Sequence, residues 1–139
     1  MDTTPKYIKM CEQAKEIQAL WGHEAYDLFT YLFPESPIYS EPQRILSPAV
    51  PGYIDMLKHD GAFWLPRQDQ LQLIFDPEVN GEIFDISTML YKFHCFLDER
   101  YDYCVDFIMS WEQSWLAFVM KKNFNKTWNN EKEVWECLN

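Results

Sequence analysis

The sequence predicts a small single domain of the α+β class, with about four helices and one or two short β-hairpins. Stretches whose apolar residues recur at helical spacing alternate with short stretches rich in aromatic residues, which are typical of strands. The 139 residues are 47% hydrophobic and 24% charged, which is ordinary for one globular domain. The 6 Trp, 8 Tyr and 10 Phe argue against disorder, because disordered chains are poor in aromatic residues.

The first predicted helix spans about residues 5–21. Thr4 is a favourable N-cap, and Pro5 suits the first helical position. Gly22 is expected to end the helix. The apolar residues between these signals recur on one helical face: Tyr7, Cys11, Ala14, Ile17 and either Leu20 or Trp21.

Residues 25–33 predict a strand, and residues 34–51 predict a stiff, irregular loop. The strand is rich in aromatic residues and alternates so that Tyr26, Leu28, Thr30 and Leu32 share one face. Five prolines in residues 34–51 exclude a helix or a central strand there. Within that loop, Ile38, Tyr39 and Ser40 are expected to form a short return strand.

Two helical segments are predicted in the middle of the chain. Residues 52–60 predict one or two helical turns. A second helix is expected to begin at Pro66, because proline is favoured at the first helical position. Its inward face would carry Leu71, Ile74 and Phe75.

The C-terminal half predicts two longer helices and a hairpin. Asp85 or Ser87 caps a helix that runs to about Arg100, whereas residues 101–109 fit either a strand or a helix. Ser110 and Gln113 form a capping-box pattern that opens a helix to about Phe124, and the tail around Trp128 and Trp135 predicts a hairpin packed on that helix. The inward residues expected for the two helices are Met89, Leu90, Phe93, Phe96 and Leu97, and Trp111, Trp115, Leu116, Val119 and Met120.

Several segments resemble a group of small uncharacterised proteins of phages and prophages of Gram-positive bacteria. The resemblance lies in residues 64–72 (WLPRQDQLQ) and 115–121 (WLAFVMK), in the Trp-containing tail, and in residues 11–21. It implies a small accessory protein of a mobile element. It implies no activity and assigns no site residues.

Charge restricts the classes of partner. Asp and Glu outnumber Lys and Arg by 22 to 12, and the net charge of −10 disfavours nucleic acid and favours basic protein surfaces. No stretch approaches the roughly 18 apolar residues of a membrane span. The N-terminus lacks the pattern of a secretory signal, so a cytoplasmic location in the host cell is expected.

The cysteines and histidines predict no metal or cofactor. None of the four cysteines has the spacing of a zinc or redox motif. His94 and Cys95 are neighbours on a predicted helix, so their side chains point about 100° apart. This geometry does not support a catalytic Cys–His pair formed by these two residues.

The densest acidic run permits three interpretations: a solvated surface, a docking surface for a basic partner, or a catalytic cluster. A second group of polar residues follows Pro66 and permits two interpretations. It forms either a buried hydrogen-bond network that fixes the start of the helix or a partner-binding face. The run comprises Asp98, Glu99, Asp102 and Asp106, and the second group comprises Arg67, Gln68, Asp69, Gln70 and Gln72.

We therefore expect a non-enzymatic protein that binds a host or phage protein with a basic surface. The sharper expectation is an inhibitor of a host defence nuclease, of the anti-CRISPR or anti-restriction kind. The alternatives are an assembly protein of the virion or replication machinery and a carboxylate-based, metal-dependent hydrolase. The expected partner-binding residues are Asp98, Glu99, Asp102, Asp106, Arg67, Gln68 and Gln70.

Overall fold

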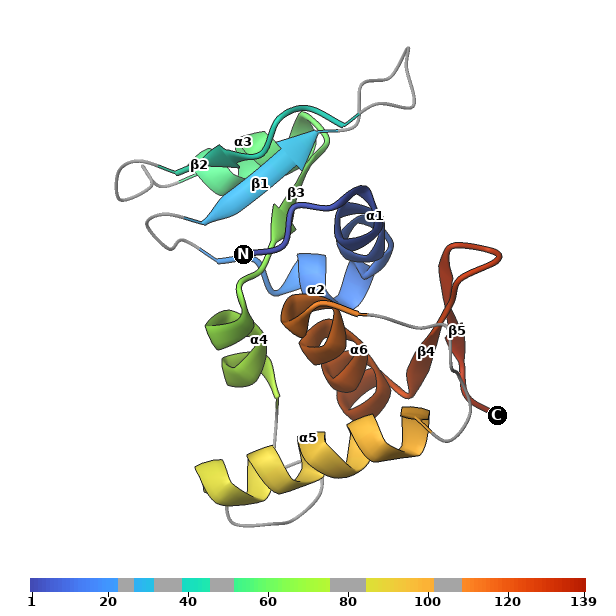
Figure 1. The fold of residues 1–139 in the computed structure, drawn as a ribbon. Helices are drawn as coiled ribbons and strands as arrows, with labels where there is room; N and C mark the ends of the chain where they lie inside the picture. Colours follow the sequence, from blue (N-terminus) through green and yellow to red (C-terminus); the bar gives the residue numbers. More distant parts are fainter. Residues whose placement is uncertain (23–26, 32–38, 46–51, 76–84, 102–108) are drawn as a thin grey trace.

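The computed structural model describes residues 1–22, 27–31, 39–45, 52–75, 85–101 and 109–139, which form helices and small antiparallel sheets (Figure 1). The predicted α+β single domain is confirmed. The elements in chain order are α1 (Pro5–Gln13), α2 (Lys15–Ala19), β1 (Leu28–Tyr31), β2 (Gln43–Arg44), α3 (Tyr53–His59), β3 (Ala62–Leu65), α4 (Gln68–Ile74), α5 (Ile86–Tyr101), α6 (Trp111–Phe124), β4 (Lys126–Asn129) and β5 (Val134–Cys137).

Helix α6 carries the longest unbroken run of buried residues in the part of the chain that the structure describes. Its residues from Gln113 to Met120 are all buried, because α1, α4, α5 and β4 pack around it. The Ser110 hydroxyl accepts a hydrogen bond from the Gln113 backbone N–H at 3.1 Å, so the predicted N-cap is confirmed. The expectation that Trp111 faces inward is wrong: it stands in the first turn and is 58% exposed.

Helix α5 lies across the lower side of α6 in Figure 1 and packs on it through aromatic rings. Phe93 stacks on Trp115 with ring centroids 3.9 Å apart and planes 9° from parallel. Met89 and Phe96 are buried beside this pair, as predicted. Leu90, also expected to face inward, is instead 49% exposed, because it lies about 100° around the helix from Met89.

A three-stranded antiparallel sheet has the order β2-β1-β3. The strand expected over residues 25–33 is confirmed at β1, where Leu28 pairs with Leu65 and Thr30 with Phe63. Strand β3 was not predicted, and the expectation that a helix begins at Pro66 is wrong by two residues. Pairing with β1 holds the residues up to Leu65 extended, and α4 begins only at Gln68.

The single helix expected over residues 5–21 is two helices. Thr4 is the N-cap of α1, as predicted, and accepts a hydrogen bond from the Tyr7 backbone N–H. Ala14 then leaves the helical conformation with φ −84° and ψ 69°. The carbonyl of Cys11 accepts from the Ala14 backbone N–H and from the Gln18 side chain, which satisfies an oxygen that the break leaves without its helical partner.

The predicted C-terminal hairpin is confirmed as β4 and β5, with Trp128 opposite Trp135. It packs on α6, as expected, and also on α1. The indole N–H of Trp135 donates to the carbonyl of Met10 at 3.0 Å. The hairpin therefore joins the last helix to the first.

The predicted loop over residues 34–51 is described only at residues 39–45. There the Ser40 backbone N–H donates to the Tyr31 carbonyl at 2.8 Å, so this part of the chain returns beside β1. Tyr39 forms an isolated bridge, and the short strand β2 follows it at Gln43 and Arg44. Pro34, Pro37, Ile38, Pro48 and Pro51 lie outside the described residues.

Candidate functional site: the outer face of helix α5

The expected acidic run begins at the C-terminal end of α5. The side chains of Asp98 and Glu99 are 66% and 59% exposed. Asp102 and Asp106 lie outside the described residues. The structure therefore places two of the four expected acidic residues on one exposed helix end.

Both described carboxylates have a basic neighbour. Asp98 lies 3.4 Å from Nε2 of His94, one turn earlier. Glu99 accepts a hydrogen bond from Nζ of Lys121 at 2.7 Å, and this bond holds the pKa of Glu99 below its ordinary value. The acidic end of α5 is therefore partly balanced by α6 and is not a bare negative surface.

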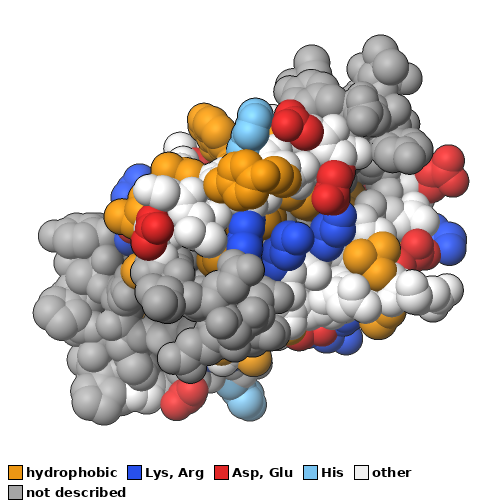
Figure 2. Space-filling model, turned by 90° about the horizontal axis from the view of Figure 1, so that it is seen from below, with side chains coloured by type: hydrophobic (Ala, Val, Ile, Leu, Met, Phe, Trp, Pro, Cys, Tyr) orange, Lys and Arg blue, Asp and Glu red, His pale blue; other side chains and the backbone are white. Residues whose placement is uncertain are grey.

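Large apolar side chains stand exposed on the same helix. Ile86, Leu90 and Tyr91 are 65%, 49% and 68% exposed. Figure 2 views the molecule from the side on which α5 lies and shows hydrophobic side chains gathered beside acidic, basic and histidine side chains. We call this surface the α5 outer face and define it by Ile86, Leu90, Tyr91, His94 and Asp98.

The α5 outer face differs from the predicted site because its centre is apolar. Leu90 was expected to face inward, and neither Ile86 nor Tyr91 was singled out. A usable signal was present in the sequence. In residues 86–101 the apolar side chains are spread over a wider part of the helix surface than the single stripe that a half-buried helix requires. Only the position of α6 decides which of them are covered.

The group after Pro66 forms a network around a buried carboxylate. Asp27 is 1% exposed; its carboxylate accepts hydrogen bonds from the indole N–H of Trp21 at 3.1 Å and from the Gln70 side-chain amide. Arg67 Nη1 lies 3.7 Å from the same carboxylate. Arg67 also holds Asp69 through two hydrogen bonds. These contacts support the interpretation of Arg67 as part of a structural network at the start of α4.

Gln70 is not supported as a partner-binding residue, because its side chain is buried. Its Oε1 accepts from the Arg67 backbone N–H at 2.9 Å, while its amide N–H donates to Asp27. Gln68 is half-buried, and the Arg67 side chain is 32% exposed. Arg67, Gln68 and Gln70 lie at the start of α4, whereas the expected acidic residues Asp98 and Glu99 lie on a different helix, α5. Asp27, which organises the network, was not predicted.

No protein-family model, curated protein or solved structure matches this chain. The described helices include none that is long and apolar enough to cross a lipid bilayer.

The described residues hold no group of three or more His, Cys, Asp or Glu side chains placed to bind a metal ion. His94 contacts Asp98 and is 70% exposed, whereas Cys11 lies in the core. Burial raises the pKa of the Cys11 thiol, which keeps it protonated. These positions give the metal-dependent hydrolase alternative no support within the described ranges.

Proposed function

We propose that this protein acts by binding another protein through the α5 outer face and performs no catalysis of its own. The observation that carries the proposal is the exposure of Ile86, Leu90 and Tyr91 beside Asp98. Contiguous exposed apolar side chains bordered by polar ones mark interaction surfaces. Tyrosine in particular is enriched at the centres of protein interfaces.

The partner that fits this face is a protein with an apolar groove bordered by Lys or Arg. Leu90 and Tyr91 would fill the groove, and Asp98 would meet the basic border. The net charge of −10 would attract such a partner over long range and make association sensitive to salt. Nucleic-acid-binding proteins carry surfaces rich in Lys and Arg, which could form the basic border. This supports the finer proposal that the chain is a phage or prophage accessory protein that inhibits a host defence nuclease.

A second copy of the chain fits the face less well than a basic partner. Two copies would each bring a net charge of −10, and this repulsion opposes association. We therefore place the assembly role second.

The first prediction concerns capture of the partner. A tagged wild-type protein and the variant Leu90→Ser/Tyr91→Ser are incubated with a Gram-positive host lysate at low and high salt. We expect the wild type to retain a nucleic-acid-binding protein at low salt and release it at high salt. The variant should lose at least about tenfold in retained partner, because two interface anchors are removed.

Two matched variants make this result specific. Leu73→Ser changes a side chain on α4 that is 81% exposed, so it should retain the partner as the wild type does. Asp98→Lys should weaken capture, whereas Glu131→Lys makes the same charge change in the hairpin turn and should not. Equal capture by the wild type and Leu90→Ser/Tyr91→Ser would rule out the α5 outer face. Undiminished nuclease activity in the presence of a captured nuclease would rule out inhibition.

A further inference from the structure

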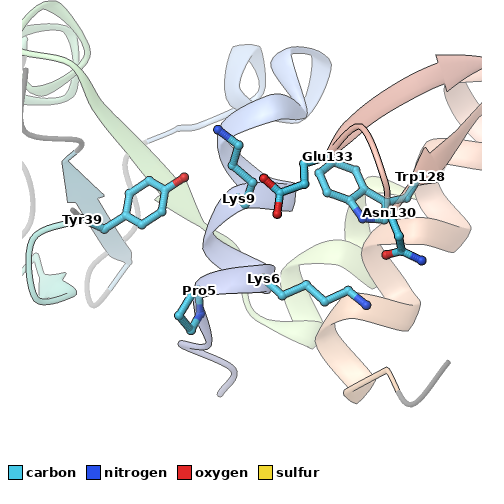
Figure 3. A pocket seen from close by; sticks show the side chains of 7 residues that line it. All are labelled: Pro5, Lys6, Lys9, Tyr39, Trp128, Asn130 and Glu133. Atoms are coloured by element: carbon cyan, nitrogen blue, oxygen red, sulfur yellow. The ribbon is translucent and has the colours of Figure 1, made fainter. Parts of the chain in front are cut away.

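A pocket of about 420 Å³ lies between the start of α1, Tyr39 and the turn of the β4–β5 hairpin (Figure 3). Lys6 and Lys9 reach it from α1, and Trp128, Asn130 and Glu133 reach it from the hairpin. Its volume falls within the range of small-molecule sites. None of its lining residues belongs to α5, so the pocket is separate from the α5 outer face.

The walls of the pocket are held in place by hydrogen bonds. Lys9 Nζ donates to Oε2 of Glu12 at 2.9 Å, and the Tyr39 hydroxyl donates to the same oxygen at 2.8 Å. Trp135 ties the hairpin to α1 through the carbonyl of Met10. A ligand would therefore meet a largely preformed site and would lose little affinity to ordering it.

Glu133 occupies a backbone conformation that its residue type rarely adopts. Its φ is 53°, in a four-residue hairpin turn where glycine or asparagine is favoured. Figure 3 shows its carboxylate pointing toward the same space as Lys9. No hydrogen bond or ion pair engages this carboxylate within the described residues. Such strain gathers at functional sites, where a side chain must be aimed in one direction.

The charges around the pocket select the class of ligand. Lys6 and Lys9 are opposed by Glu12 and Glu133, so the site has little excess charge of either sign. A multiply charged anion such as a nucleotide would find too little compensation. Lysine has three N–H donors, and Lys9 spends one on Glu12, so two remain for an anionic oxygen. The rings of Tyr39 and Trp128 provide apolar walls.

We propose that this pocket binds a small zwitterion of the α-amino acid class. The ligand carboxylate would accept hydrogen bonds from Lys9. The ligand ammonium group would donate to Glu133. An apolar side chain would lie against Tyr39 and Trp128.

The test is titration calorimetry with L-phenylalanine, N-acetyl-L-phenylalanine, L-phenylalanine amide and adenosine monophosphate. We expect saturable binding of L-phenylalanine with a dissociation constant of about 1 mM or lower. Removing either ligand charge should weaken binding about tenfold or more. Absence of saturable L-phenylalanine binding, or tighter binding of the nucleotide, would overturn the proposal.

Glu133→Gly locates the ammonium contact without endangering the fold, because glycine relieves the left-handed backbone. We expect its melting temperature to equal or exceed that of the wild type and its affinity for L-phenylalanine to fall about tenfold. N-acetylation of the ligand should then cause no further loss, since both changes remove one contact. Glu131→Gln, in the same turn, should bind as the wild type. A full further loss on N-acetylation in Glu133→Gly would place the ammonium group elsewhere.

Discussion

Asp2 shows how one side chain near the start of the sequence organises a helix near its end. Its carboxylate accepts hydrogen bonds from the Ser110 hydroxyl, from the Gln113 side-chain amide at 2.7 Å and from the Thr4 backbone N–H at 2.8 Å. The capping box expected at Ser110 and Gln113 therefore exists only in part. Gln113 turns toward Asp2, whose negative charge is favourable at the N-terminus of α6.

This arrangement predicts a pH-dependent contribution of Asp2 to stability. Burial alone would raise the pKa of Asp2, but the hydrogen bonds outweigh burial and hold that pKa below its ordinary value. The unfolded chain therefore takes up the proton first as the pH falls. The stabilisation is complete above the unfolded pKa, about 3.9, and is lost as the pH falls through the lower folded pKa.

The variant Asp2→Asn tests this contribution by urea unfolding at several pH values. At neutral pH we expect it to lower the free energy of unfolding by about 1–2 kcal/mol, because it removes a buried carboxylate from a helix N-terminus. The difference from the wild type should shrink in acid. Asp55→Asn, at an exposed position, should change stability by less than about 0.5 kcal/mol. Equal stability of Asp2→Asn and the wild type at neutral pH would contradict the assignment.

Among the elements, β3 is completed by a side chain rather than by another strand. It forms one edge of the β2-β1-β3 sheet. The Trp64 backbone N–H donates to Gln18 Oε1 at 2.7 Å, and the Gln18 amide donates to the Trp64 carbonyl at 3.0 Å. The Tyr7 hydroxyl donates to the carbonyl of Pro66 just beyond the strand. Side chains of α1 and α2 thus imitate a neighbouring strand and protect the edge.

Gln18→Ala should therefore destabilise the protein far more than an ordinary surface substitution. We expect a loss of about 1–3 kcal/mol, because the Trp64 N–H and carbonyl lose their partners at a buried position. Urea unfolding measures the loss, and hydrogen exchange at the Trp64 amide should accelerate with it. Gln72→Ala, a half-buried glutamine of α4, provides the control. Unchanged protection of the Trp64 amide would show that this edge does not depend on Gln18.

At the scale of the whole molecule, features that depend on residues close together in the sequence, such as helix caps, could be predicted. Features that depend on contacts between distant segments, such as β3 and the pocket, could not. Thr4 and Ser110 cap their helices as expected, because capping acts within one turn. Strand β3 was missed because its extended form requires β1, far away in sequence. The pocket was missed for the same reason: α1, Tyr39 and the hairpin meet only in the fold.

The candidate docking site was predicted in part. Asp98 and Glu99 were identified from local charge density, and both are exposed. The lysine that neutralises Glu99 belongs to α6, so no local pattern could reveal it. Gln70 was misjudged because its polar side chain is buried against Asp27, a position that only the tertiary fold creates.

The charge of the whole molecule predicts its oligomeric state in solution. With 22 acidic against 12 basic residues, copies repel one another, so we expect a monomer of 16.8 kDa at every concentration tested. Sedimentation equilibrium at low and moderate salt measures this mass. A concentration-dependent dimer that is lost in Leu90→Ser/Tyr91→Ser would instead assign the α5 outer face to self-assembly.

Contacts between segments far apart in the sequence delay the packing of α1 during synthesis. Gln113 and Trp135 bond to groups that lie 111 and 125 residues earlier, Asp2 and Met10. At about 5–20 residues per second, the ribosome releases α1 on the order of 10 seconds before these partners emerge. Through that interval the apolar residues of α1 lack the surface of α6 on which they pack in the folded protein. We therefore expect the packing of α1 against α6 and the hairpin to form late in folding, because contacts between distant segments form slowly.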